Sequence, residues 1–195
     1  MNLIYVPKLM GYRAKLAVCI LLLTAIPLPS HAGKSLSEYR LKAALIYRLT
    51  KFVEWPVLYL KQHQRSFGVC LLGEDKFGNA LDELEERKVR GLPITVYRFS
   101  QSGDINKQCQ IVFISDSKRA FVKPILQRMQ GIPILTLSDM AEFAEQGGML
   151  QFTTGKNRIG FMINLESAKQ SNLTISAPLV DLSTVVNAGP EKIKE

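Results

Sequence analysis

Short apolar segments alternate with segments of helical spacing between residues 67 and 145, and this pattern constrains the fold more than any other feature. The apolar segments are 67–72, 94–99, 111–114 and 133–137. Helices are predicted over 77–87, 118–129 and 139–145, and a polar loop covers 100–108. Short strands covered on both faces are continuous apolar runs, and helical crossovers join them when they run parallel. The sequence therefore predicts a single α/β domain, with a mostly parallel twisted sheet and helices on both faces.

The alternation changes after residue 148. Residues 149–153 and 158–164 flank the turn-forming sequence Thr-Gly-Lys-Asn. This arrangement predicts an antiparallel β-hairpin at one edge of the sheet. Three further segments complete the prediction: a helix over 165–170 capped by Asn164, a last helix over 177–186, and a disordered tail over 189–195.

The first 32 residues have the pattern of a cleaved signal peptide. They contain three cations and no acid, followed by an apolar run over 16–28 and by Ser-His-Ala at 30–32. The run is shorter than the roughly 20 residues of a spanning helix, although an uncleaved anchor is the alternative. We therefore expect export, and a mature α/β domain over 33–188.

The charge of the chain bears on its partners. The formal net charge is +8, and three of the cations lie in the predicted signal peptide. An exported, mildly basic domain is not expected to bind nucleic acid. The excess of positive charge suits an anionic membrane surface or an acidic partner. The alternative is that the cations are simply solvated at the protein surface.

The cysteines predict a disulfide. Cys19 lies in the predicted signal peptide, so Cys70 and Cys109 remain in the mature chain. In the doubly wound strand order 2-1-3-4-5, the first and third strands are neighbours. Cys70 lies in the first predicted strand, and Cys109 lies just before the third. Neighbouring strands lie about 4.8 Å apart, within the span of a disulfide. The mature chain has one histidine, His63, so no metal site is predicted.

The first predicted helix of the mature domain carries a cation in an unexpected place. The sequence at 35–38 fits a capping box, so the helix should begin near Ser37 and end before Pro56. Helical spacing gives an apolar face of Leu41, Leu45, Ile46, Leu49, Phe52 and Val53, and an opposite arc of Arg40, Arg48, Lys51 and Glu54. Lys42 falls within the apolar face. Either its ammonium extends outward to water, or it is held in or beside a groove by a carboxylate.

Sequence motifs for catalysis are missing. The chain contains no nucleophile elbow, P-loop, zinc-protease or dinucleotide-binding motif, and a Ser-His-acid triad would need His63. We expect no catalytic residue and no cofactor. Two loops at the carboxyl ends of predicted strands form a candidate ligand crevice of Gly73, Glu74, Asp75, Ser115 and Asp116. The alternative is that Asp75 and Ser117 are ordinary helix caps.

Several segments in this order resemble the YfiR family of periplasmic proteins. They are KAALIYRLTKFVEWP, VCLLGEDKFGNAL, GLPITVYRF, CQIVFIS, ILTLSDMAEFAEQGGML and RIGFMINLESAKQSNLTISAPL, which together run from about residue 38 to 186. The first and fifth segments are the more specific ones. Lys42 matches the lysine of the family's Lys-Ala-Ala pattern.

The resemblance implies a non-enzymatic periplasmic repressor. It would restrain a membrane-bound diguanylate cyclase through the periplasmic sensor region of that cyclase, and so control cyclic di-GMP and biofilm formation. It also implies a cysteine pair at Cys70 and Cys109, whereas a second pair found in better-studied members is missing here. An outer-membrane lipoprotein and a second copy of the chain are further candidate partners. The residues expected to contact the partner are Arg40, Lys42, Arg48, Lys51 and the turn at 154–158. The rival function is a periplasmic small-solute-binding module that uses the crevice.

Overall fold

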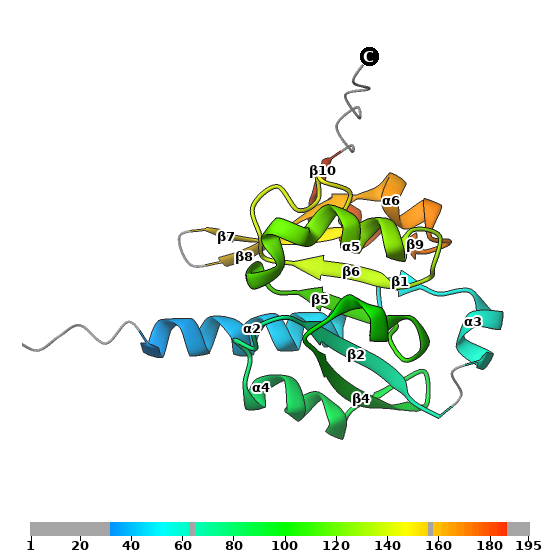
Figure 1. Cartoon of the computed structure of the whole chain (residues 1–195), viewed down its shortest axis with the longest axis horizontal. Helices are drawn as coiled ribbons and strands as arrows, with labels where there is room; N and C mark the ends of the chain where they lie inside the picture. Colours follow the sequence, from blue (N-terminus) through cyan, green and yellow to red (C-terminus); the bar gives the residue numbers. More distant parts are fainter. Residues whose placement is uncertain (1–31, 63–64, 156–157, 187–195) are drawn as a thin grey trace, which may run out of the picture. The chain divides into compact units, whose positions relative to one another are not determined.

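The computed structural model describes residues 32–62, 65–155 and 158–186, and its main feature is an eight-stranded sheet (Figure 1). The strands lie in the order β10-β8-β7-β6-β5-β2-β4-β3. Their bounds are β2 Phe67–Leu72, β3 Lys88–Val89, β4 Leu92–Phe99, β5 Ile111–Ile114, β6 Leu135–Ser138, β7 Leu150–Gly155, β8 Arg158–Asn164 and β10 Thr184–Val186. All neighbours pair in parallel except β7 with β8 and β3 with β4. The predicted mostly parallel sheet is confirmed, and its part β4-β2-β5-β6 has the predicted order.

Helices cover both faces of the sheet. Alternate residues of β2 face opposite sides, so Phe67, Val69 and Leu71 join one core and Cys70 and Leu72 join the other. The first core contains helix α2 (Ala32–Leu49), together with residues of α4 (Asn79–Asp82), α6 (Leu165–Gln170) and α7 (Ala177–Asp181). The second contains α5 (Val122–Met129) and the 3-10 helix η2 (Ser102–Lys107).

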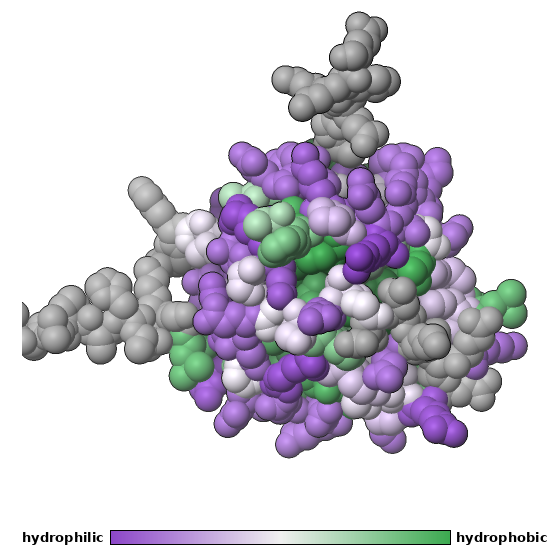
Figure 2. Space-filling view, viewed as in Figure 1, coloured by the Kyte–Doolittle hydropathy of each residue, from purple (hydrophilic) through white to green (hydrophobic). Residues whose placement is uncertain are grey.

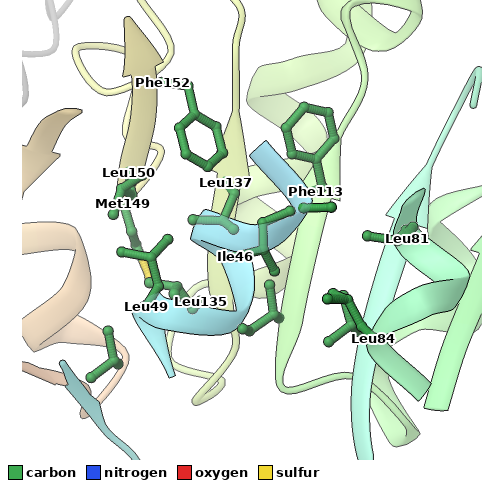
Figure 3. Packing of buried hydrophobic residues seen from close by; sticks show 14 of the residues in the cluster. Ile46, Leu49, Leu81, Leu84, Phe113, Leu135, Leu137, Met149, Leu150 and Phe152 are labelled. Atoms are coloured by element: carbon green, nitrogen blue, oxygen red, sulfur yellow. The ribbon is translucent and has the colours of Figure 1, made fainter. Parts of the chain in front are cut away.

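Helix α2 is anchored on the sheet by aliphatic side chains. Figure 3 shows Ile46 and Leu49 of α2 among Phe113, Leu135 and Leu137 of the central strands. All five side chains are at most 2% exposed. Burial of a Leu or Ile side chain stabilises a fold by about 1.5–3 kcal/mol, so these contacts fix the position of α2.

The predicted ends of the first helix are wrong. Helix α2 begins at Ala32 instead of Ser37, so Glu38 is not at a helix start and binds Lys42 and Thr154. The helix ends at Leu49, because Val53–Glu54 form strand β1, which pairs antiparallel with β9 (Thr174–Ile175). The alternation of buried Val53, exposed Glu54 and buried Trp55 is a strand pattern within what we predicted to be helix. A short helix, α3 (Val57–Gln62), follows Pro56.

The segment 77–87 is only partly the predicted helix. It divides into α4 and the 3-10 helix η1 (Glu83–Glu86), and Arg87 is already extended. Strand β3 then turns back into β4 through Arg90 and Gly91, which both have positive φ. The predicted loop 100–108 contains η2. The helix predicted over 118–129 is confirmed with a late start, because the 3-10 helix η3 (Asp116–Phe121) precedes α5.

The C-terminal part confirms two predictions and corrects three. The hairpin β7–β8 is present, and Asn164 caps α6 by accepting a hydrogen bond from the Ser167 N–H at 2.9 Å. The helix predicted over 139–145 is a series of turns, with Glu142 at φ 63°. The helix predicted over 177–186 ends at Asp181, because Thr184–Val186 form β10 beside β8. The β-branched residues of β10 favour a strand, and β10 rather than the hairpin forms the edge of the sheet.

Two predicted segments lie outside the described residues. They are the signal peptide, apart from Ala32, and the tail over 189–195. Within the part of the chain that the structure describes, no helix has both the length and the apolar character needed to cross a membrane.

Candidate functional site

Lys42 is buried and held by two carboxylates. Its side chain is only 2% exposed, and its Nζ lies 2.6 Å from Asp139 Oδ2 and 2.7 Å from Glu38 Oε1. The Tyr39 hydroxyl donates to the same Asp139 oxygen at 2.7 Å, and Lys42 Nζ lies 4.3 Å from the centre of the Tyr39 ring. Of the two alternatives for Lys42, the structure has the ammonium paired with carboxylates and not extended to water.

The Lys42 cluster joins α2 to the carboxyl end of the sheet. Asp139 directly follows β6, and Glu38 accepts a hydrogen bond from Thr154 of β7 at 3.1 Å. Burial raises the pKa of Tyr39, and the nearby Asp139 carboxylate raises it further. Because these contacts fix the rotation of α2 about its axis, they also determine which of its residues point to solvent.

Acidification should weaken the cluster through Glu38. The hydrogen bond from Lys42 lowers the pKa of Glu38 below its usual 4.5, although burial opposes this. A lowered folded-state pKa stabilises the protein above the usual pKa, and that stabilisation is lost as the pH falls through the folded value. The loss of unfolding free energy in Glu38→Gln should therefore be largest above about pH 5.5 and shrink below pH 4.5. Urea denaturation across this range measures it.

The control for this pH dependence is Glu145→Gln, which changes an exposed carboxylate outside the cluster. Its effect on unfolding should be small at every pH. A Glu38→Gln effect that grows as the pH falls would contradict the ion pair.

The outward side of α2 forms one wall of a groove. We call it the α2–η1 groove; its volume is about 500 Å³ and its other wall is the α4–η1 segment. Ten residues line it: Arg40, Ala44, Tyr47, Arg48, Lys51, Phe52, Ala80, Glu83, Leu84 and Arg87. The structure thus brings together three of the four residues predicted to contact a partner, Arg40, Arg48 and Lys51, and leaves Lys42 out of the lining.

Tyr47 and Arg87 are groove residues that the sequence analysis did not single out. Arg87 lies at the end of η1, and its guanidinium carbon is 5.9 Å from the centre of the Tyr47 ring. Lys51 Nζ approaches the same ring at 5.7 Å. The helical spacing of α2 places Tyr47 beside Lys51, but nothing local in the sequence brings Arg87 to α2.

The two loops of the predicted crevice lie side by side, and Ser117 joins them. The Glu74 N–H donates to Ser117 Oγ at 2.9 Å, and a Cβ on Gly73 would lie 2.5 Å from that oxygen. The backbone therefore approaches closely here, which suits the positive φ of Gly73. Asp116 pairs with Arg119.

Asp75 in the predicted crevice is held by backbone N–H groups and by an arginine, but the N-cap of α4 is Gly78. Its Oδ1 accepts from the N–H groups of Phe77 and Gly78, and its Oδ2 accepts from Arg98 Nε at 2.7 Å. Burial raises the pKa of Asp75, but these hydrogen bonds outweigh burial and leave the pKa lowered. The cap alternative is wrong for both residues, because Ser117 lies within η3, whose N-cap is Ser115. A ligand role for these loops stays a prediction.

A second cavity, of about 340 Å³, lies next to this crevice. Its lining includes Leu72 at the end of β2, Ser102, Lys118, Phe121 and Arg128, and none of the five predicted crevice residues. Among the described residues, no group of His, Cys, Asp and Glu side chains is arranged to hold a metal ion.

A scan against protein-family models matches residues 39–184 to the family described as YfiR/HmsC-like. The chain belongs to the YfiR/HmsC-like family. This family is regulatory rather than catalytic, and membership supports a regulatory role in the periplasm in general terms. A search of curated proteins finds no match.

Among solved structures, the chain is similar to a conserved domain protein from Vibrio cholerae O1 biovar El Tor, with 10% identity and a TM-score of 0.41. The match covers 66% of this chain and 58% of the Vibrio chain.

The YfiR/HmsC-like chain contains the predicted Cys70–Cys109 disulfide. The two Cα atoms are 5.8 Å apart, and both side chains are fully buried in the core on the α5 side. Gly68 permits the close passage of the chain before Cys109, because a Cβ there would lie 1.7 Å from the Gln108 carbonyl oxygen. The Tyr59 hydroxyl donates to the Cys109 carbonyl at 3.0 Å. The disulfide thus lies on the face of the sheet opposite to α2.

Proposed function

We propose that this YfiR/HmsC-like protein acts in the periplasm as a non-enzymatic repressor of an inner-membrane diguanylate cyclase. The match to the family over residues 39–184 carries the proposal. The repressor would contact the periplasmic sensor region of the cyclase and favour its inactive state. It lowers the active fraction only by binding the inactive state more tightly than the active one.

The arrangement of α2 supports a role in binding. The buried Lys42 cluster and the aliphatic side chains fix one side of the helix, and Arg40, Arg48 and Lys51 are exposed on the other. We propose these three residues as part of the contact surface. The described residues of the 154–158 turn, which are 154, 155 and 158, are exposed and form a second candidate surface. An outer-membrane lipoprotein or a second copy of the chain could release or modify the repression.

Deletion of the gene tests the repressor function. Cellular cyclic di-GMP and surface attachment should rise, and a plasmid copy of the gene should reverse both. The rise should disappear when the partner cyclase is deleted as well, because the repressor has no other route to the nucleotide. Unchanged cyclic di-GMP, in cells shown to express the protein, would reject the proposal.

The alternative function is a periplasmic small-solute-binding module. The cavity of about 340 Å³ at the carboxyl end of β2 favours it, because open α/β sheets bind ligands at that end of their strands. The genes beside this one separate the two functions. A gene for a membrane protein with a cyclase domain supports the repressor, and transporter genes support the solute-binding module.

A further inference from the structure

The α2–η1 groove has a marked excess of positive charge. Four of its lining residues are cations, Arg40, Arg48, Lys51 and Arg87, and Glu83 is the single acid. All four cations are exposed. The ion pairs found within the described residues involve other cations, Lys42, Arg98 and Arg119. The charges of the groove are therefore available to an external anion.

An aromatic ring lies between the cations. Lys51 and Arg87 both approach the Tyr47 ring, so a side chain from each wall is placed by the same residue. Cation–π contacts at exposed sites contribute about 0.5–1 kcal/mol each, and they leave the N–H donors of the cations free to bind carboxylates. The two walls thus present donors toward one another.

The length of the groove indicates a chain rather than a small ion. Arg40 and Arg48 are eight residues apart in α2, which corresponds to about 12 Å along the helix. Lys51 extends the row beyond the end of the helix. One phosphate or carboxylate reaches only one or two of these cations. An extended peptide rises about 3.3 Å per residue, so about four residues span the row.

The lining of the groove argues against a flat anionic surface. Ala80 and Leu84 are buried in the wall formed by α4 and η1, and Phe52 is half-buried at the end of α2. A membrane surface would meet the exposed cations but not these recessed apolar side chains. Figure 2 shows the α5 side of the molecule, where hydrophobic residues appear in separate areas on a mostly hydrophilic surface.

We propose that the α2–η1 groove binds an acidic peptide segment of a protein partner, with an apolar side chain of that segment against Phe52 and Leu84. Carboxylates spaced along the segment would pair with Arg40, Arg48, Lys51 and Arg87. The inference rests on the proposed function in one respect: the partner is the membrane protein that the chain regulates. The binding chemistry itself can be measured without that partner.

The test uses the purified mature chain and two labelled peptides, Glu-Asp-Phe-Glu-Asp and its uncharged counterpart Gln-Asn-Phe-Gln-Asn, followed by fluorescence anisotropy. The acidic peptide should bind at least tenfold more tightly, and its affinity should fall as salt rises. In Arg40→Glu/Arg87→Glu, which reverses one charge on each wall, affinity for the acidic peptide should fall at least tenfold. Both side chains are exposed, so the variant should keep the circular dichroism spectrum and Tm of the wild type.

The matched control is Lys123→Glu/Lys169→Glu. It makes the same change in net charge at two exposed positions, on α5 and α6, outside the groove. Its affinity for the acidic peptide should stay within threefold of the wild type. Equal losses in both variants would mean that net charge alone attracts the peptide, and would overturn the groove.

Two competitors identify other occupants. Inorganic phosphate that displaces the peptide at a 1:1 ratio below 1 mM would indicate a small-anion site. We expect no such displacement, because the row of cations is ~12 Å long. Binding to phosphatidylglycerol vesicles that Arg40→Glu/Arg87→Glu abolishes, without binding of the peptide, would indicate a membrane surface. Either result would overturn the proposal.

The two proposals fail in different ways. If gene deletion raises cyclic di-GMP but Arg40→Glu/Arg87→Glu represses normally, the repressor function stands and the groove is not its contact. If deletion changes nothing while the acidic peptide binds in a groove-dependent way, the groove stands and the regulated partner is a different protein.

Discussion

Replacement of Lys42 by alanine should lower the free energy of unfolding by about 3–5 kcal/mol, the range for breaking a buried ion pair. The Lys42 side chain is 2% exposed, and its ammonium lies between Asp139 and Glu38. Its loss leaves the Asp139 carboxylate, which is only 13% exposed, with the Tyr39 hydroxyl and without a cation. Urea denaturation at pH 7 measures the change. The exposed Lys169→Ala serves as the control and should change stability by less than about 0.5 kcal/mol.

A double-mutant cycle separates the ion pair from the packing of the lysine stem. In Lys42→Ala/Asp139→Asn, the amide oxygen at 139 still accepts from Tyr39, and the carboxylate left without a cation is that of Glu38, which is 29% exposed. The double variant should therefore lose less stability than the sum of the single variants, by about 0.5–3 kcal/mol. Additive losses would show that Lys42 and Asp139 are not coupled, and that Lys42 stabilises the fold through its aliphatic stem and through Glu38.

The sequence was informative about the sheet because periodicity is a local property. The runs 67–72, 111–114 and 133–137 are continuous and apolar, and all three lie in the centre of the sheet. Their order followed from general rules of topology. The strands β1, β9 and β10 were missed because they contain two or three residues each, and their pairing depends on segments far away in the sequence.

The apolar face of α2 shows a different limit. Leu41 was assigned to that face but is 48% exposed, whereas Tyr39 and Ala43 are buried. The predicted face was misplaced because it included Phe52 and Val53, which lie beyond the end of α2. The acid that makes a buried lysine acceptable, Asp139, lies 97 residues further on. No local pattern identifies it.

Only one of the two walls of the α2–η1 groove followed from the sequence. The wall made by α2 followed from helical spacing, which placed Arg40, Arg48 and Lys51 away from the core. The wall made by α4 and η1 depends on how residues 79–87 fold back onto α2, and the sequence predicted one continuous helix there. Arg87 faces the groove only because that segment ends in an extended residue.

Removal of the disulfide in Cys70→Ala/Cys109→Ala should cost about 4 kcal/mol of unfolding free energy. The bridge closes a loop with a sequence separation of 39 residues, and the chain-entropy model gives about this value for a loop of about 40 residues. Urea denaturation with and without dithiothreitol measures the effect, and dithiothreitol should change only the unfolding of the wild type. Both sulfurs are fully buried, so dithiothreitol should not reduce the bridge until urea unfolds the chain.

The same variant tests whether the two faces of the sheet act independently. The disulfide lies in the core on the α5 side, and the groove lies against α2 on the other side. Cys70→Ala/Cys109→Ala, at a temperature where it stays folded, should therefore bind the acidic peptide within threefold of the wild type. Two free thiols in protein purified from the periplasm would contradict the bridge itself. A large loss of peptide binding in the folded variant would instead show that the bridge controls the groove through the sheet, and would make the disulfide a regulatory rather than a stabilising element.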